Sequence, residues 1–291
     1  MQVALPSKGS TSFGASIVLL FVTSATNALR WTVIASSLVI AIILTGCGSW
    51  SGSQSGQAAV PAPAIPAPIP AAEPVLLYDG TGTSPSDVAA IEAVLGTLGV
   101  GYITANSSQL EATSEAQLGG YTLLIVPGGN SITIGQNLSS AATATIRNAV
   151  AQYGLHYLGI CAGAFFGGYS TYNGVDLTSG VWFNFYGDES KGIHLEAVAI
   201  SLPNGGPLDV YWQDGPQLSG WGDVVAKYPD GTAAIVEGKS GNGFVVFTGV
   251  HLEAPAGWRT GMTFTTPLSV DLGYAGTLIQ AALAGTPLPH F

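Results

Sequence analysis

Short apolar runs that end in glycine-rich turns, each followed by a segment of helical composition, place the strongest constraint on the fold of this chain. Val75–Tyr78 leads into a glycine loop and then, from Ser84, into apolar residues at helical spacing. The same order returns after the apolar runs 121–126 and 155–160. Strands that alternate with helices form a mostly parallel sheet covered on both faces. We therefore expect an α/β domain of three layers.

Beyond residue 169 the pattern changes to paired, alternating segments separated by turn residues. The expected strands are 181–183, 195–202, 209–212, 224–228, 233–237 and 244–249. Turn sequences such as Asp230-Gly231 separate them, which is typical of antiparallel hairpins. We expect these hairpins to be added to the parallel sheet, and residues 269–283 to close the chain as a helix.

The first 46 residues have the character of an export signal. Arg30 precedes an apolar run that stops at Leu44-Thr45-Gly46-Cys47. This ending resembles the lipobox of bacterial lipoprotein signal peptides. The resemblance implies a signal peptide over residues 1–46, cleavage before Cys47 and diacylation of the Cys47 sulfur. The alternative is an uncleaved membrane-spanning anchor, and both readings tether the domain to a membrane.

Residues 47–73 read as a stalk between that anchor and the domain. A Gly/Ser-rich coil passes into a Pro/Ala stretch, and such a stretch favours the extended polyproline II conformation. The domain itself is expected over residues 74–291. We expect it to stand outside the cytoplasm, held at the cell membrane by the lipid on Cys47.

Charge and cysteine content exclude two classes of protein. Seven basic and 17 acidic residues give a net charge of −10 at pH 7, so no basic surface is available to neutralise phosphates. Nucleic acid is therefore not an expected partner. Two cysteines in 291 residues do not make a disulfide framework. Cys47 and Cys161 each need an explanation of their own.

Cys161 lies between a predicted buried strand and a predicted helix, with glycine two residues before it and two after. This is the pattern of a nucleophile elbow, in which the nucleophile takes a strained backbone conformation and flanking side chains would collide. A helix N-terminus favours the thiolate, and the N–H of Ala162 would point to a developing oxyanion. Gly129 would supply a second N–H. The alternative is a small buried thiol that only packs.

A nucleophilic cysteine needs a base, and the chain has four histidines. His156 lies inside a predicted strand, which favours a packing role, and His290 is next to the terminus. His194 and His251 both begin the tripeptide His-Leu-Glu. His251 follows an apolar strand, whereas His194 starts an alternating strand with an exposed face. We therefore assign the base to His251 and the group that orients it to Glu253.

The motif order resembles that of class I glutamine amidotransferases, which have a flavodoxin-like sheet and a Cys-His-Glu triad that attacks an amide carbonyl. The blocks 75–85, 126–129, 159–167 and 247–253 resemble more closely the N-terminal domain of biotin-protein ligases. The resemblance implies these roles for Cys161, His251 and Glu253. Phe165 stands where the glutaminases have a substrate-binding glutamine, and no biotin loop of a ligase is present.

The leading expectation is an extracytoplasmic cysteine hydrolase that acts on an amide or related acyl bond of a small molecule or peptide. Residues expected to contact the substrate are Tyr78, Asp79, Gly128, Trp212 and Asp214. Each of them is also compatible with ordinary packing or a turn. The competing hypothesis is a binding module that keeps the pocket without turnover. A redox sensor would lack a resolving cysteine, and no metal or other cofactor is expected.

Overall fold

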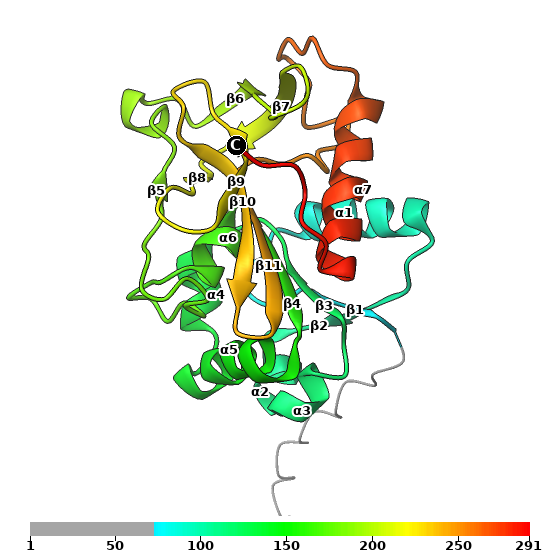
Figure 1. The fold of residues 1–291 in the computed structure, drawn as a ribbon, viewed down its shortest axis with the longest axis vertical. Helices are drawn as coiled ribbons and strands as arrows, with labels where there is room; N and C mark the ends of the chain where they lie inside the picture. Colours follow the sequence, from blue (N-terminus) through cyan, green and yellow to red (C-terminus); the bar gives the residue numbers. More distant parts are fainter. Residues whose placement is uncertain (1–72) are drawn as a thin grey trace, which may run out of the picture. The chain divides into compact units, whose positions relative to one another are not determined.

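The computed structural model of the protein describes residues 73–291 (Figure 1). The expected signal peptide, Cys47 and nearly all of the stalk lie outside the described residues. In the described part of the chain, no helix combines the length and the apolar character that crossing a membrane requires.

A seven-stranded sheet forms the centre of residues 73–291, in the order β2-β1-β3-β4-β11-β10-β9 (Figure 1). The parallel strands are β1 (Val75–Tyr78), β2 (Tyr102–Ala105), β3 (Leu123–Val126), β4 (His156–Ile160) and β11 (Gly243–Thr248). The antiparallel strands at one edge are β10 (Ala233–Ser240) and β9 (Asp223–Lys227). The expected mostly parallel sheet is therefore confirmed.

Helices cover both faces of this sheet, because each central strand is apolar on both sides. Val75 and Leu77 of β1 face one core, and Leu76 and Tyr78 face the other. The first core is closed by α1 (Pro85–Leu98) and α7 (Leu268–Ala284), which contact each other. The helices of the second core are α2 (Ser107–Ala112), α3 (Glu115–Leu118), α4 (Ser131–Gln136), α5 (Ser140–Tyr153) and α6 (Ala162–Gly167).

The antiparallel strands do not all join the main sheet, although all were expected to. The strands β9 and β10 do extend the sheet through β11. However, β6 (Leu195–Ile200) and β7 (Leu208–Gln213) form a two-stranded ladder of their own. Its apolar residues, which include Val210 and Trp212, pack into the core that α1 and α7 close. Burial of that face fixes the position of this ladder, together with single bridges from Tyr211 to His251 and from Ser201 to Lys227 of β9.

Residues 181–183 do not form the expected strand. The carbonyl of Val181 accepts hydrogen bonds from the Tyr169 N–H and the Thr178 hydroxyl, which holds this segment in a loop. Pairing begins just after it, where β5 (Asn184–Phe185) meets β8 (Pro216–Gln217). A short 3-10 helix at Glu189–Lys191 follows.

Candidate active site

Cys161 occupies the turn between β4 and α6, at the carboxyl end of the parallel strands. Its φ of 50° and ψ of −105° lie in a region that side-chain-bearing residues rarely adopt. A Cβ on Gly159 would lie 2.5 Å from the Gly163 carbonyl oxygen, and one on Gly163 would lie 1.8 Å from the Val126 carbonyl oxygen. Close packing therefore requires both glycines, and the backbone has the geometry of the predicted elbow.

The neighbouring strand β11 carries His251 to the same edge of the sheet. The register that pairs Ile160 with Thr248 places the two strand ends side by side, and the Cys161 N–H donates to the Thr248 carbonyl at 2.8 Å. His251 is 4% exposed, and its Nδ1 lies 2.8 Å from Oε1 of Glu253, which is 2% exposed. The predicted base and its orienting carboxylate are thus brought together.

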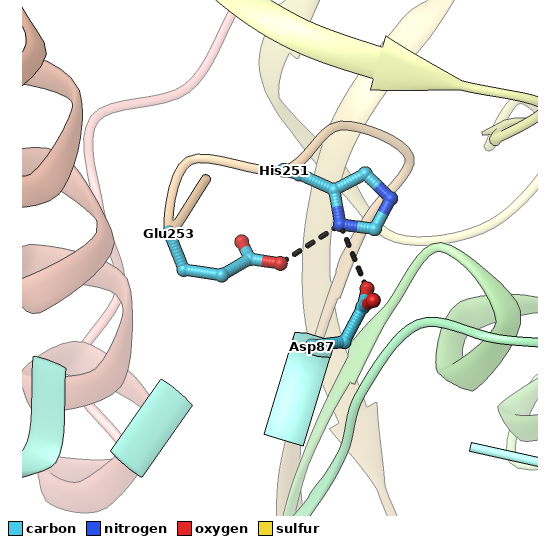
Figure 2. Close-up of side chains that lie close together, drawn as sticks. All are labelled: Asp87, His251 and Glu253. Atoms are coloured by element: carbon cyan, nitrogen blue, oxygen red, sulfur yellow. Dashed lines mark hydrogen bonds and ion pairs between the residues drawn. The ribbon is translucent and has the colours of Figure 1, made fainter. Parts of the chain in front are cut away.

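A second carboxylate, which the sequence analysis missed, reaches the same ring nitrogen. Oδ1 of Asp87 lies 3.3 Å from His251 Nδ1, and Asp87 is 6% exposed. Figure 2 shows both carboxylates directed at Nδ1, while the other ring nitrogen, Nε2, points away from them. One buried imidazole therefore has two acidic neighbours on one side, and the Cys161 thiol is a further hydrogen-bond partner of the ring.

The sequence around Asp87 gives a different signal. Ser84 and Asp87 have the spacing of a capping box, in which the acidic side chain would bond the Ser84 N–H. Ser84 does cap α1 through its hydroxyl, but its N–H donates to the Gly128 carbonyl at 3.0 Å instead. The Asp87 carboxylate is therefore free to face His251. The spacing of Ser84 and Asp87 is thus that of a helix cap, although Asp87 belongs to the site.

Electrostatics favour a charged His251. Burial by itself would lower the pKa of His251, but the Glu253 carboxylate and the Cys161 thiol, which both act as close acidic partners, raise it well above its ordinary value. Because an imidazolium next to a cysteine stabilises the thiolate, this arrangement suits a cysteine nucleophile. Cys161 and His251 are thus held together as a buried pair.

Cys161 and His251 line a cavity of about 640 Å³. The residues expected to hold an oxyanion, Gly129 and Ala162, line it as well. Within residues 73–291 no protein acceptor takes the backbone N–H of either residue. Gly129 has a φ of 143°, and a Cβ there would lie 2.2 Å from the Gly82 carbonyl oxygen. Two unpaired N–H groups beside the thiol are therefore available to a substrate oxygen.

Of the predicted substrate contacts, the structure places Asp214 on the cavity wall and Gly128 behind the imidazole. Asp214 accepts a hydrogen bond from Nδ1 of His194 at 2.8 Å, and His194 also lines the cavity. A Cβ on Gly128 would lie 2.0 Å from Asp87 Oδ1 and 2.7 Å from His251 Cε1. Gly128 therefore makes room for the Asp87–His251 contact.

Tyr78, Asp79 and Trp212 do not line the cavity. Tyr78 is fully buried in the core that α2 to α6 cover, and its hydroxyl is 2.8 Å from Ser107 Oγ. Trp212 is fully buried with its ring edge against Tyr186. Asp79 is exposed outside the cavity wall. Tyr78 and Trp212 therefore pack in the core, which is the alternative that the sequence left open for them.

The remaining wall combines hydroxyl and amide groups with aromatic rings. None of these residues was predicted to contact the substrate. The polar ones are Ser84, Ser86, Asn130, Ser131, Glu189 and Gln213, and the apolar ones are Ile132, Phe165, Phe185, Tyr211 and Trp258. The thiol of Cys161 donates to the Gln213 carbonyl at 3.5 Å, so β7 lies against the nucleophile.

Asp87, His251 and Glu253 are the residues that could hold a metal ion in the described part of the chain. Their ligand atoms lie within 4.8 Å of one another. One imidazole and two carboxylates would suit a divalent transition metal. The hydrogen bond between His251 and Glu253 accounts for their contact without an ion. The expectation that no metal is needed stays a prediction.

Comparisons with known proteins find similarity in fold and, for the first part of the domain, in sequence. No curated protein matches the chain. Similar solved structures include a glutamine amidotransferase (20% identity, 62% of this chain and 90% of that one, TM-score 0.48). PurLQS from Thermotoga maritima is another (16% identity, 72% of this chain and 99% of that one, TM-score 0.47). An exo-beta-1,4-mannosidase from Opitutaceae bacterium strain TAV5 is matched over only 36% of its length (13% identity, 72% of this chain, TM-score 0.45).

The family model described as biotin-protein ligase, N terminal, matches residues 73–194. The match includes Cys161 and Asp87 and ends before His251 and Glu253. Residues 73–194 are therefore similar to the biotin-protein ligase N-terminal domain family, the resemblance that the sequence motifs predicted.

Proposed function

We propose that this protein is a cysteine hydrolase that cleaves an amide or related acyl bond. The observation that carries the proposal is the convergence at one cavity of a strained Cys161 and a His251 oriented by buried carboxylates. Two unpaired N–H groups complete the set that acyl transfer requires. In this proposal Cys161 is the nucleophile, His251 the base, Glu253 the group that orients it, and Gly129 with Ala162 the oxyanion site.

The reaction follows from these positions. His251 takes the proton of Cys161, and the thiolate sulfur attacks the substrate carbonyl carbon. The N–H groups of Gly129 and Ala162 bind the oxyanion that forms. When the C–N bond breaks, His251 returns the proton to the leaving amine, and a thioester remains on Cys161. His251 then takes a proton from water, whose oxygen attacks the thioester and releases the acid and the thiol.

The two carboxylates keep His251 ready for both proton transfers. Glu253 accepts the Nδ1–H at 2.8 Å, which leaves Nε2 to exchange protons with the thiol and the leaving group. Asp87 adds a second negative charge 3.3 Å from the same nitrogen. Both stabilise the imidazolium that forms when the thiol is deprotonated.

We further propose that the hydrolase is an extracytoplasmic lipoprotein. The support is the export-type run and the sequence Leu44-Thr45-Gly46-Cys47. Mass spectrometry of the membrane fraction tests this part separately. Loss of residues 1–46 together with a diacylated Cys47 is expected, and an intact N-terminus would contradict it.

Alkylation of Cys161 by iodoacetamide tests the hydrolase chemistry. The full chain carrying Cys47→Ser is used, so that Cys161 is the only thiol. We expect His251→Ala to slow alkylation at pH 7 by about tenfold or more, because the base that generates the thiolate is lost. His290→Ala is the matched control, since His290 is exposed and does not line the cavity.

A Cys161 that does not react, or one that reacts at the same rate in His251→Ala, would sink the hydrolase proposal. That outcome would favour a binding module on the same fold. A reactive, His251-dependent thiol would justify a screen of amides with release of the free amine as the readout.

A further inference from the structure

The charge of the cavity wall restricts the substrate that the proposed hydrolase can accept. Three acidic residues line the cavity, Asp87, Glu189 and Asp214, and no lysine or arginine lines it within residues 73–291. The Asp87 carboxylate is directed at His251. Glu189 and Asp214 are partly exposed on the wall, and Asp214 also contacts His194.

Asp214 is fixed in position. Its N–H donates to the His194 carbonyl at 3.1 Å, and its carboxylate accepts from His194 Nδ1 at 2.8 Å. The carboxylate of Glu189 makes no side-chain hydrogen bond or ion pair in the described part of the chain, and Glu189 begins the short helix at the same wall. The cavity wall thus presents these two acidic groups and His194.

The nearby cations are engaged elsewhere. Lys191 pairs with Asp188. The Arg259 guanidinium donates to Asp271 at 2.9 Å and lies over the Phe264 ring. Neither cation lines the cavity. Apart from its two histidines, the ionisable wall residues are therefore acidic, which makes a substrate carboxylate less favourable there than a cation.

Aromatic rings make the wall favourable to a cation and to an apolar segment. Phe165 and Phe185 contact each other with ring centroids 5.0 Å apart, and Tyr211 and Trp258 do so at 5.3 Å. All four rings line the cavity. Ring faces attract ammonium and guanidinium groups and bury methylene chains.

We infer that the cavity selects amides carrying a positive charge, joined to the scissile bond through an apolar segment. This inference rests on the proposed function, because it names the substrate class of the same site. Glu189 and Asp214 bind the cationic end while the carbonyl lies against Cys161.

Methanethiosulfonates of opposite charge test the inference without a known substrate. The Cys161 thiolate attacks their sulfenyl sulfur, forms a mixed disulfide and releases methanesulfinate. A trimethylammonium-ethyl, a sulfonato-ethyl and a neutral methyl reagent are each reacted with the full chain carrying Cys47→Ser. Each rate is divided by the rate with free 2-mercaptoethanol, which removes intrinsic differences between reagents.

We expect the normalised rate of the cationic reagent to exceed that of the anionic one by about tenfold or more at low salt, because an acidic cavity concentrates cations. The ratio should fall towards one at 1 M salt, where the screening length is about 3 Å. The Glu189→Gln/Asp214→Asn double variant should lower the ratio at least about threefold. Asp223→Asn, an exposed acidic residue outside the cavity wall, is the control and should leave it unchanged.

The outcomes separate the two proposals. A thiol that reacts with the neutral reagent but shows no charge preference, or a preference unaffected by the double variant, overturns the inference and leaves the hydrolase intact. A thiol inert to all three reagents overturns the proposed function itself. A charge preference that the double variant reduces and Asp223→Asn preserves supports the inference.

Discussion

At the scale of single residues, two carboxylates share one imidazole nitrogen, and their distances rank their effects. Glu253 lies 2.8 Å from His251 Nδ1 and Asp87 lies 3.3 Å away. We expect Glu253→Gln to slow alkylation of Cys161 by about tenfold or more, because an amide orients the ring less well and cannot stabilise the imidazolium. Asp87→Asn should slow it less, by about threefold. Equal rates in wild type and both variants would contradict these roles.

The space beside that nitrogen depends on Gly128. An added Cβ would lie 2.0 Å from Asp87 Oδ1 and 2.7 Å from His251 Cε1, so Gly128→Ala must displace one of the two side chains. We expect at least a tenfold lower alkylation rate with the fold retained. Gly96→Ala is the control, since nothing lies within 4 Å of its added Cβ and alanine favours the helix. Alkylation rates and melting temperatures of both variants check this prediction.

The site could be predicted from sequence where its residues follow strands in compact motifs, as Cys161 and His251 do. Asp87 could not, because its pattern is that of a helix cap and its partner comes from a distant segment. Along β7, Tyr211 and Gln213 line the cavity while Trp212 between them is buried in the core. Successive side chains alternate between faces, so an error of one position exchanges a cavity residue for a core residue.

At the scale of secondary structure elements, the elbow depends on how closely α6 approaches β3. A Cβ on Gly163 would lie 1.8 Å from the Val126 carbonyl oxygen, and backbone atoms have little freedom to move away. We expect Gly163→Ala to lower the free energy of unfolding by about 3 kcal/mol or more. Gly273→Ala in α7 meets nothing within 4 Å and should be neutral or stabilising. Chemical denaturation of both variants measures the difference.

The long elements were predictable because apolar spacing repeats over several turns. The helices Pro85–Leu98 and Leu268–Ala284 lie where the pattern placed them. The short helices α2 and α3 were missed, since six and four residues carry too little periodicity. Their capping boxes, which begin at Asn106 and Ser114, are the signals that would have found them. The separate β6–β7 ladder depends on tertiary packing, which spacing along the chain does not reveal.

At the scale of the whole molecule, several carboxyl groups lie in surroundings that disfavour their charged form. Burial raises the pKa of Asp271 to about 6, although Arg259 opposes the shift. Burial, together with a hydrogen bond to Asp188, raises the pKa of Glu196 to about 7. The pKa of His251 is raised too, but for a histidine this shift favours the charged form. A pKa raised in the folded state contributes stability that is present below the unfolded value and lost as pH rises through the folded value.

For Asp271 this loss falls between its ordinary value of 3.8 and about 6. Asp271→Asn removes the titration, so its free energy of unfolding relative to wild type should rise between pH 4 and pH 7. Roughly two pKa units correspond to about 3 kcal/mol. Glu196→Gln should show a rise of the same sign between about pH 4.5 and pH 7. Denaturant unfolding of the three proteins at half-unit pH steps measures the two differences. A stability difference between variant and wild type that stays flat, or that falls with rising pH, would contradict this prediction. It would show that the folded state compensates the burial cost of these carboxylates.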